Sequence, residues 1–214
     1  MKILASDLDG TLYFGDEEEH LKPQDVKAIK EFQAQGNLFG ICSGRTLAGI
    51  HHALDGLDVT LDFYILGSGS MLARKDGSYI YQHLLTKDVI SRIVDDIIDY
   101  DVRILFCADR QYYAIDKRQI ENVKARHMVI EHVSEAKEEL YDSLHLAFKT
   151  MEELEEVKAL LKNNFKGEIE VHHNVLNLDI TPFGCSKGKA IRTLDKYLPV
   201  KYEDIYVIGN SYND

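Results

Sequence analysis

Residues 2–14 of this 214-residue chain read KILASDLDGTLYF, and this stretch decides how the rest is interpreted. Residues 2–6 form a short, mostly apolar run with the length of a buried strand. Asp7 and Asp9 follow at once, and the alternation of side chains along a strand places both carboxylates on the same side. Adjacent carboxylates repel each other. We therefore expect either that one stays protonated or that a cation lies between them.

The turn that follows these carboxylates points to an anionic ligand. Gly10 and Thr11 are expected to turn the backbone sharply and to leave amide N–H groups facing an anion. In open α/β sheets, ligands bind at the carboxyl ends of the strands, which is where this turn lies. A bare Asp-x-Asp pair is also compatible with an acidic turn, but the full string DLDGTL directly after an N-terminal strand is more specific.

The composition limits the classes of function. A hydrophobic content of 45% and a charged content of 29% are typical of a soluble globular protein of one or two domains. The net charge of −11 argues against a nucleic-acid partner. No apolar run approaches the roughly 18 residues of a membrane span, and no signal peptide is recognised, so we expect no membrane partner. The three cysteines, few and far apart, suggest neither disulfides nor a zinc site, and the cytoplasm is the expected compartment.

Strands and helices alternate at both ends of the chain. After the strand at 2–6, the pattern predicts a helix from Pro23 to Gly36, a strand at 37–42, a helix at 46–54 and a strand at 63–66. The same pattern resumes at Ser186 with a helix to about residue 198 and a strand at 205–208. The predicted fold class is therefore α/β, with a doubly wound parallel (Rossmann-like) sheet.

The middle of the chain has a different character. Turn signals predict a hairpin of residues 71–74 and 79–82, and Thr86 and Thr150 are expected to cap helices. Strands are predicted at 102–107, 112–115 and 144–149, and a strand pair at 168–171 and 175–180 turns at His173 and Asn174; residues 116–134 stay unassigned. The expected organisation is a core domain of residues 1–82 and 182–214 with an inserted α+β domain of residues 83–181.

Two further groups of polar residues follow strands or open helices. Ser43, Gly44 and Arg45 end the second strand, where a hydroxyl and a loop amide suit a phosphoryl oxygen; a helix-capping serine with a turn glycine is the alternative. Lys187 follows the expected cap Ser186, and a cation there opposes the helix dipole by roughly 0.3–1 kcal/mol. That position makes sense if Lys187 neutralises an anion or the carboxylates, the alternative being an exposed lysine.

The last group is GNSYND, residues 209–214, after the final strand. The side-chain oxygens of Asn210 and Asp214 suit a hard cation such as Mg²⁺, and a polar loop is the alternative.

Taken in order, these groups resemble the four motifs of the haloacid dehalogenase (HAD) superfamily over essentially the whole chain. The phrase DITPFGCSKGKAI and the size and place of the insertion resemble the Cof-type branch, which has a large α/β cap. The resemblance implies a Mg²⁺-dependent phosphatase that acts through an aspartyl-phosphate on a small-molecule phosphate ester, such as a sugar phosphate. A cap would roof the site and exclude water, which favours small substrates. We expect a monomer or a weak dimer.

The resemblance also implies roles for single residues. Asp7 would be the nucleophile and Asp9 the acid and base, while Ser43 and Lys187 would hold phosphoryl oxygens. The substrate-binding residues would be Gly10, Gly44 and Arg45, and the Mg²⁺ ligands Asp7, the backbone carbonyl of Asp9, Asn210 and Asp214.

The chain departs from the family pattern in three places. Asn210 stands where the last motif usually has an acidic residue, and Ser68 in GSGS stands where Cof-type relatives usually show an Asn-Gly pair. Relatives commonly continue beyond this motif, so a chain that stops at Asp214 is expected to leave a sheet edge uncovered. These departures keep two alternatives open: a phospho-ligand-binding or regulatory protein with weakened turnover, and a phosphotransferase that passes phosphate to a sugar.

Overall fold

The computed structural model describes residues 1–15, 17–115 and 127–210 and divides the chain into two compact units. The core unit comprises Met1–Gln82 and Cys185–Asp214, and the inserted unit comprises His83–Gly184. The sequence places the second boundary after residue 181, whereas the structure places it after Gly184. The reason is that Pro182 still pairs with Ile169 in the sheet of the inserted unit.

The core unit is built on a six-stranded sheet in the order β14-β1-β2-β3-β4-β5. β14, β1, β2 and β3 run parallel, and β4 and β5 add an antiparallel hairpin at one edge. Its strands are β1 (Ile3–Ser6), β2 (Leu38–Cys42), β3 (Phe63–Leu66), β4 (Met71–Arg74), β5 (Tyr79–Gln82) and β14 (Ile205–Ile208). The order reverses between β1 and β14, as in a doubly wound sheet, so the predicted α/β class is confirmed.

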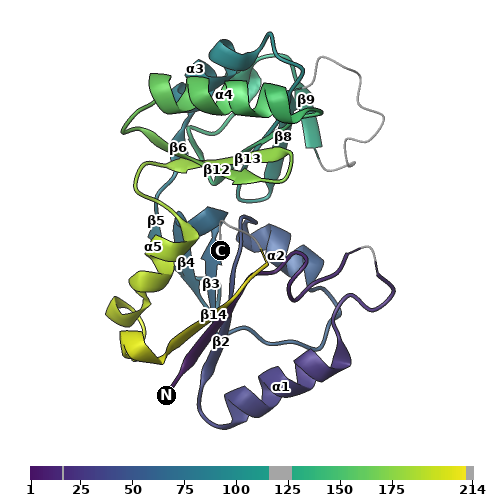
Figure 1. Ribbon diagram of the computed structural model, residues 1–214, viewed down its shortest axis with the longest axis vertical. Coiled ribbons are helices and arrows are strands. Elements are labelled where there is room, and N and C mark those ends of the chain that lie inside the picture. Colours follow the sequence, from purple (N-terminus) through teal and green to yellow (C-terminus); the bar gives the residue numbers. More distant parts are fainter. Residues whose placement is uncertain (16, 116–126, 211–214) are drawn as a thin grey trace. The chain divides into compact units, whose positions relative to one another are not determined.

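Helices cover both faces of this sheet. α1 (Pro23–Ala34) and α2 (Leu47–Ala53) lie on one face, and α5 (Lys187–Arg192) lies on the other (Figure 1). Pro23 starts α1 because its fixed φ suits the first helical turn, and Gly36 follows the helix with a φ of +80°. Buried apolar side chains such as Ile3, Phe63 and Ile191 fill the space between the sheet and α5.

The helix that opens at Lys187 is shorter than predicted. It ends at Arg192 instead of near residue 198, and a 3₁₀ turn at Leu194–Lys196 follows. The Thr193 hydroxyl donates a hydrogen bond to the Ala190 carbonyl at 2.8 Å, and such a bond competes with continued α-helix.

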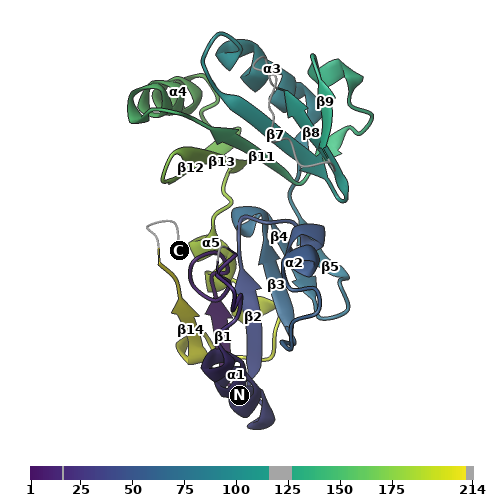
Figure 2. The same ribbon diagram turned by 90° about the vertical axis from the view of Figure 1, so that its right-hand side faces the viewer.

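The inserted unit contains a six-stranded sheet in the order β12-β13-β11-β7-β8-β9, with α3 (Lys87–Ile97) and α4 (Met151–Asn164) on one face (Figure 2). Its main strands are β7 (Arg103–Ala108), β8 (Gln111–Ile115), β9 (His127–Ile130), β11 (Ser143–Ala147), β12 (Ile169–Asn174) and β13 (Asn177–Pro182). A short pair, β6 (Leu85–Thr86) and β10 (Leu140–Tyr141), lies outside this sheet. Of the unassigned stretch 116–134, residues 127–130 form β9, and 116–126 lie outside the described residues.

Local side-chain chemistry explains where the two long helices of the inserted unit begin. The hydroxyls of Thr86 and Thr150 accept hydrogen bonds from the backbone N–H groups of Val89 and Glu153, each at 3.3 Å. The sequence predicts both threonines as helix caps, and these hydrogen bonds confirm that prediction. The Glu153 carboxylate also accepts a hydrogen bond from the Thr150 hydroxyl, at 3.1 Å.

The hairpin between β12 and β13 turns two residues later than predicted. His173 and Asn174 belong to β12, and the turn is formed by Val175 and Leu176. Val175 has a φ of +52° and is 75% exposed. A β-branched residue is unusual in this conformation, which is why the sequence pattern assigns Val175 to the strand.

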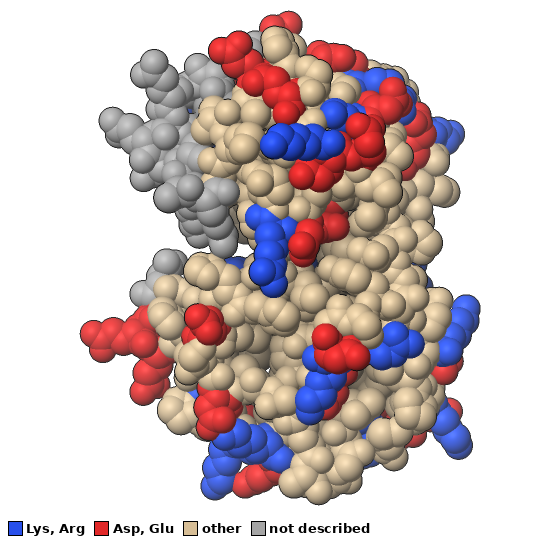
Figure 3. Space-filling model, turned by 180° about the vertical axis from the view of Figure 1, so that it is seen from behind, with Lys and Arg blue, Asp and Glu red and all other residues tan. Residues whose placement is uncertain are grey.

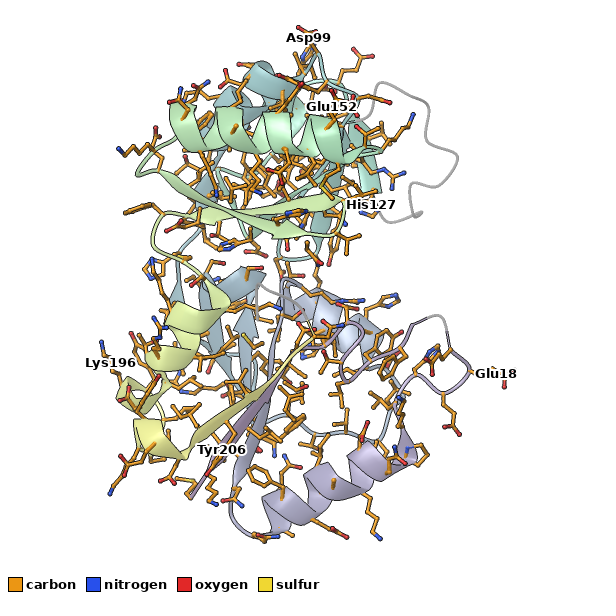
Figure 4. All side chains as sticks on the ribbon, in the orientation of Figure 1. Glu18, Asp99, His127, Glu152, Lys196 and Tyr206 are labelled. Atoms are coloured by element: carbon orange, nitrogen blue, oxygen red, sulfur yellow. The ribbon has the colours of Figure 1, made fainter. Side chains whose placement is uncertain are left out.

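Acidic and basic side chains are mixed over the face of the molecule in Figure 3. Among the described residues, no helix is long and apolar enough to cross a bilayer. Large apolar side chains are exposed on the edge strand β14, namely Tyr206, Val207 and Ile208. Tyr206 is labelled in Figure 4. Among the described residues, β14 is the outer strand on this side of the core sheet.

Candidate active site

The polar groups predicted from the sequence meet at one edge of the core sheet. β1, β2, β3 and β14 are parallel, so their carboxyl ends share this edge. The Asp7 N–H donates to the Ile208 carbonyl at 2.8 Å, and the Ser43 N–H donates to the Ile65 carbonyl at 2.9 Å. These bonds extend the backbone hydrogen bonding between neighbouring strands past the strand ends. They fix the first residues of both loops beside the reversal of strand order, where doubly wound sheets bind ligands.

Asp7 and Lys187 form a buried ion pair within the core unit. Lys187 Nζ lies 2.6 Å from Asp7 Oδ1, and the residues are 5% and 7% exposed. The Ser186 hydroxyl caps α5 by accepting from the Lys189 N–H, which holds Lys187 at the first helical position. Lys187 is therefore not an ordinary exposed lysine. Thr11 Oγ1 makes a longer hydrogen bond, 3.4 Å, to the other oxygen of Asp7.

Asp9 is paired with a different cation. Arg45 donates from Nε to Asp9 Oδ2 at 2.8 Å and from Nη2 to Asp9 Oδ1 at 2.6 Å. This two-point geometry is the strongest form of an arginine–carboxylate contact, although the Asp9 side chain is 52% exposed. The Arg45 guanidinium also lies 5.7 Å from the centre of the Tyr13 ring. Each carboxylate of the DLD sequence thus has its own cation, instead of the two sharing one.

The backbone of the DLDG turn differs from the prediction. The Gly10 N–H donates to the Tyr13 carbonyl at 2.9 Å, and the Thr11 N–H donates to the Leu8 carbonyl at 3.3 Å. These two amides are satisfied within the loop, so the expectation that they face an anion is wrong for this structure. Gly10 has a φ of +76°, which explains why a glycine is needed at this position.

Ser43 lies at the end of β2 and is only 2% exposed. Its hydroxyl accepts a hydrogen bond from the Arg45 N–H at 3.2 Å, across the half-buried Gly44. The cap of α2 is Thr46, whose hydroxyl accepts from the Gly49 N–H at 3.2 Å. The alternative interpretation of Ser43 as a helix cap is therefore wrong.

Asn210 joins the last motif to the first. Its Nδ2 donates to the Gly10 carbonyl at 3.1 Å, and a Cβ added at Gly10 would lie 2.7 Å from that nitrogen. Asp214, the other residue of this motif predicted to bind metal, lies outside the described residues. Within the described ranges, no group of three or more His, Cys, Asp or Glu side chains is arranged to hold a metal ion. The structure thus brings Asp7, Asp9, Ser43, Lys187 and Asn210 to one edge.

Sequence reasoning overlooked the role of Gly69, which follows β3. A Cβ at Gly69 would lie 2.2 Å from the Ser186 carbonyl oxygen, so the backbone of this turn contacts the start of α5 directly. Its φ is +97°. The signal in the sequence was the pair of glycines in GSG, since a second glycine in a short turn often marks a close backbone approach.

Comparisons with known proteins identify the family of this chain. Residues 4–214 match the model of the haloacid dehalogenase-like hydrolase family. An uncharacterized protein of Mycoplasma capricolum is 27% identical over 229 residues, which cover 100% of this chain and 85% of the relative. The 5-amino-6-(5-phospho-D-ribitylamino)uracil phosphatase YwtE of Bacillus subtilis is 27% identical over 241 residues, covering 100% and 83%.

The fold has a close counterpart among solved structures. A HAD/COF-like hydrolase from Plasmodium vivax superimposes with a TM-score of 0.85 at 21% identity, covering 100% of this chain and 80% of the other. The resemblance inferred from the sequence motifs is confirmed at the level of family and fold. This chain belongs to the haloacid dehalogenase-like hydrolase family.

Proposed function

We propose that this hydrolase is a Mg²⁺-dependent phosphatase that acts on a small phosphorylated metabolite, such as a sugar phosphate, through an aspartyl-phosphate intermediate. The observation that carries the proposal is the buried Asp7–Lys187 pair, 2.6 Å apart, beside Ser43 and Asp9. Phosphoryl transfer needs a nucleophile, an acid and base, and positive groups set in place around the phosphoryl oxygens. The sheet edge supplies all three.

Asp7 would attack phosphorus, because it is the carboxylate held most firmly at the edge. Its backbone N–H is fixed on β14, and Lys187 binds one of its oxygens. The same ammonium would neutralise charge on the transferring phosphoryl group. The Ser43 hydroxyl accepts from the Arg45 N–H, so its own proton can be donated to a phosphoryl oxygen.

Asp9 would protonate the leaving oxygen and then take a proton from the attacking water. It must first be released by Arg45, which binds both of its oxygens. The guanidinium donors match a phosphate as well as they match a carboxylate. We therefore assign Arg45 as the group that moves from Asp9 to the phosphoryl oxygens when substrate arrives, in line with the substrate-binding role that the family resemblance implies for it.

The oxygen atoms of Asp7 and Asn210 fit a hard cation such as Mg²⁺. The Asp7 carboxylate and the Asn210 side-chain amide both contain oxygens of the kind that Mg²⁺ prefers. When bound, Mg²⁺ would offset negative charge on the phosphoryl group. The Asp9 backbone carbonyl and Asp214 would complete the set expected from the family motif.

The relatives support a small phosphorylated metabolite as the substrate. By its name, the YwtE protein removes phosphate from a phosphoribitylamino uracil, and others among the relatives are named HMP-PP phosphatases. The net charge of −11 makes the site dependent on its local cations and does not favour a polyanionic substrate.

Asn210 favours one alternative, a phospho-ligand-binding protein with weakened turnover. A neutral amide gives the metal site one formal charge fewer than a carboxylate would, and this lowers affinity for a dication. Turnover at saturating Mg²⁺ distinguishes a phosphatase from a phospho-ligand-binding protein. Product analysis with an added sugar acceptor separates hydrolysis from phosphotransfer.

The test is hydrolysis of a chromogenic phosphate monoester with and without Mg²⁺. Asp7→Asn should abolish turnover while keeping phosphate binding, and Asp9→Asn should slow turnover about 10²–10⁴-fold. Asp58→Asn is the control, because Asp58 forms an exposed ion pair with Lys30. Near-wild-type turnover in purified Asp7→Asn would refute the aspartyl-phosphate mechanism, and phosphate binding without turnover in the wild type would favour the binding protein.

A further inference from the structure

The 3₁₀ turn Gly67–Gly69 is attached to the loop that carries Ser43. The Gly67 N–H donates to the Arg45 carbonyl and the Ser68 N–H donates to the Ser43 carbonyl, both at 3.0 Å. The turn follows β3, whose carboxyl end lies next to that of β2. Ser68 is therefore a backbone neighbour of Ser43 at the edge where the candidate active site lies.

The same turn contacts the segment that carries Lys187. A Cβ at Gly69 would lie 2.2 Å from the Ser186 carbonyl oxygen and 2.9 Å from the backbone nitrogen of Lys187. The Tyr81 hydroxyl donates to the Gly69 carbonyl at 3.3 Å, which holds the turn from β5. Ser68 thus lies between the two elements that present Ser43 and Lys187.

Ser68 has two unfavourable features at once. Its φ of 52° and ψ of 34° place a residue with a Cβ in the left-handed region, where a glycine would be unstrained. Its hydroxyl is buried, and within the described residues it has no hydrogen-bond partner. Ser68 itself is only 2% exposed. A glycine would remove both penalties, so the protein gives up stability by having a serine here.

We propose that the Ser68 hydroxyl is a further phosphoryl-binding group of this site. A phosphate ester offers several anionic oxygens, and a buried hydroxyl without a protein partner gains most from a charged acceptor. Ser43, Asp7 and Lys187 are buried like Ser68, but the polar side-chain atoms of those three residues have partners. The ligand that satisfies Ser68 is a phosphate monoester or inorganic phosphate. This inference rests on the proposed function.

Ser70 is a matched control on the same turn. Its hydroxyl is also buried and has no partner among the described residues, and Ser70 is 0% exposed. Its φ of −74° is ordinary, and its N–H donates a hydrogen bond to the Gly67 carbonyl before the chain enters β4. Removing this hydroxyl should change stability and leave phosphate binding unchanged.

The experiment is calorimetric titration of the full chain with inorganic phosphate, together with thermal unfolding and turnover of a phosphate ester. Ser68→Gly should raise Tm and weaken phosphate binding about 10-fold or more, the scale of one hydrogen bond to a charged group. Ser68→Ala should weaken binding as much but gain less stability than Ser68→Gly, because it removes the unpartnered hydroxyl while the strain at φ remains. Ser70→Ala should bind phosphate like the wild type.

Each result supports or overturns the assignment. Weaker phosphate binding in both Ser68 variants, with binding kept in Ser70→Ala, supports it. If the wild type hydrolyses the ester but folded Ser68→Gly and Ser68→Ala bind phosphate as it does, the Ser68 assignment falls and the proposed function stands. If the wild type neither binds phosphate nor hydrolyses the ester, the proposed function falls and the assignment falls with it.

Discussion

Replacing Lys187 by Met tests whether the Asp7–Lys187 pair behaves as a buried pair. The two side chains are 10% and 6% exposed and their charged atoms lie 2.6 Å apart, so water screens them little. Removing one partner takes away the opposite charge that compensates the other buried charge, which should cost about 3–5 kcal/mol of unfolding free energy. For a chain of this size, that corresponds to a fall in Tm of about 6–20 °C. Asp7→Asn alone should lose stability for the same reason.

The double variant makes the prediction specific. With both charges removed, no unpaired charge is left, so Asp7→Asn combined with Lys187→Met should unfold within about 1–2 kcal/mol of the wild type. Urea titrations of the four proteins give the coupling energy directly. Lys30→Met serves as the control, because the Lys30–Asp58 pair is exposed and should contribute less than about 1 kcal/mol. Strictly additive losses in the double variant would refute this reasoning.

Three further predictions concern a glycine, the metal and pH. Gly69→Ala should lower both Tm and kcat, because its methyl would lie 2.2 Å from a carbonyl oxygen of the α5 segment; Gly36→Ala, with open space at a φ of +80°, should lower Tm alone. Asn210→Asp should reduce the Mg²⁺ concentration for half-maximal activity roughly 10–100-fold, and superimposable Mg²⁺ titrations would contradict this. Burial alone would lower the pKa of His145, but the charge and hydrogen bond of Asp179 outweigh it and raise that pKa. The pair should therefore stabilise the fold fully below about pH 6.5 and lose that effect as pH rises; Asp179→Asn should flatten this part of the urea-midpoint profile.

Much of the fold could be predicted because the relevant signals are local. The strand Phe63–Leu66 and the helix starts after Thr86 and Thr150 follow from apolar runs and from hydroxyls that cap the next turn. The hairpin at Val175 could not be predicted in the same way. Its turn position depends on which residues of the neighbouring strands pack into the core, and this outweighs the preference of valine for strands.

The site was predictable as a set of residues but not as a set of contacts. Parallel strands bring their carboxyl ends together, so Asp7, Ser43 and Asn210 could be placed at one edge. The sequence does not say that Lys187 pairs with Asp7 while Arg45 pairs with Asp9. Nor does it reveal that the Gly10 amide is used inside its own loop. Such choices depend on side-chain reach and on competition among donors, which motif spacing does not encode.

The 180-residue separation between Asp7 and Lys187 has a consequence for folding during synthesis. The inserted unit is one continuous segment, so it can fold as soon as His83–Gly184 has been made. The core unit has to wait, because α5 and β14 are made after the inserted unit. Until then, β1 exposes an unpaired edge and Asp7 has no ammonium partner. The nascent chain therefore passes through a stage in which the inserted unit is complete and the core unit is not.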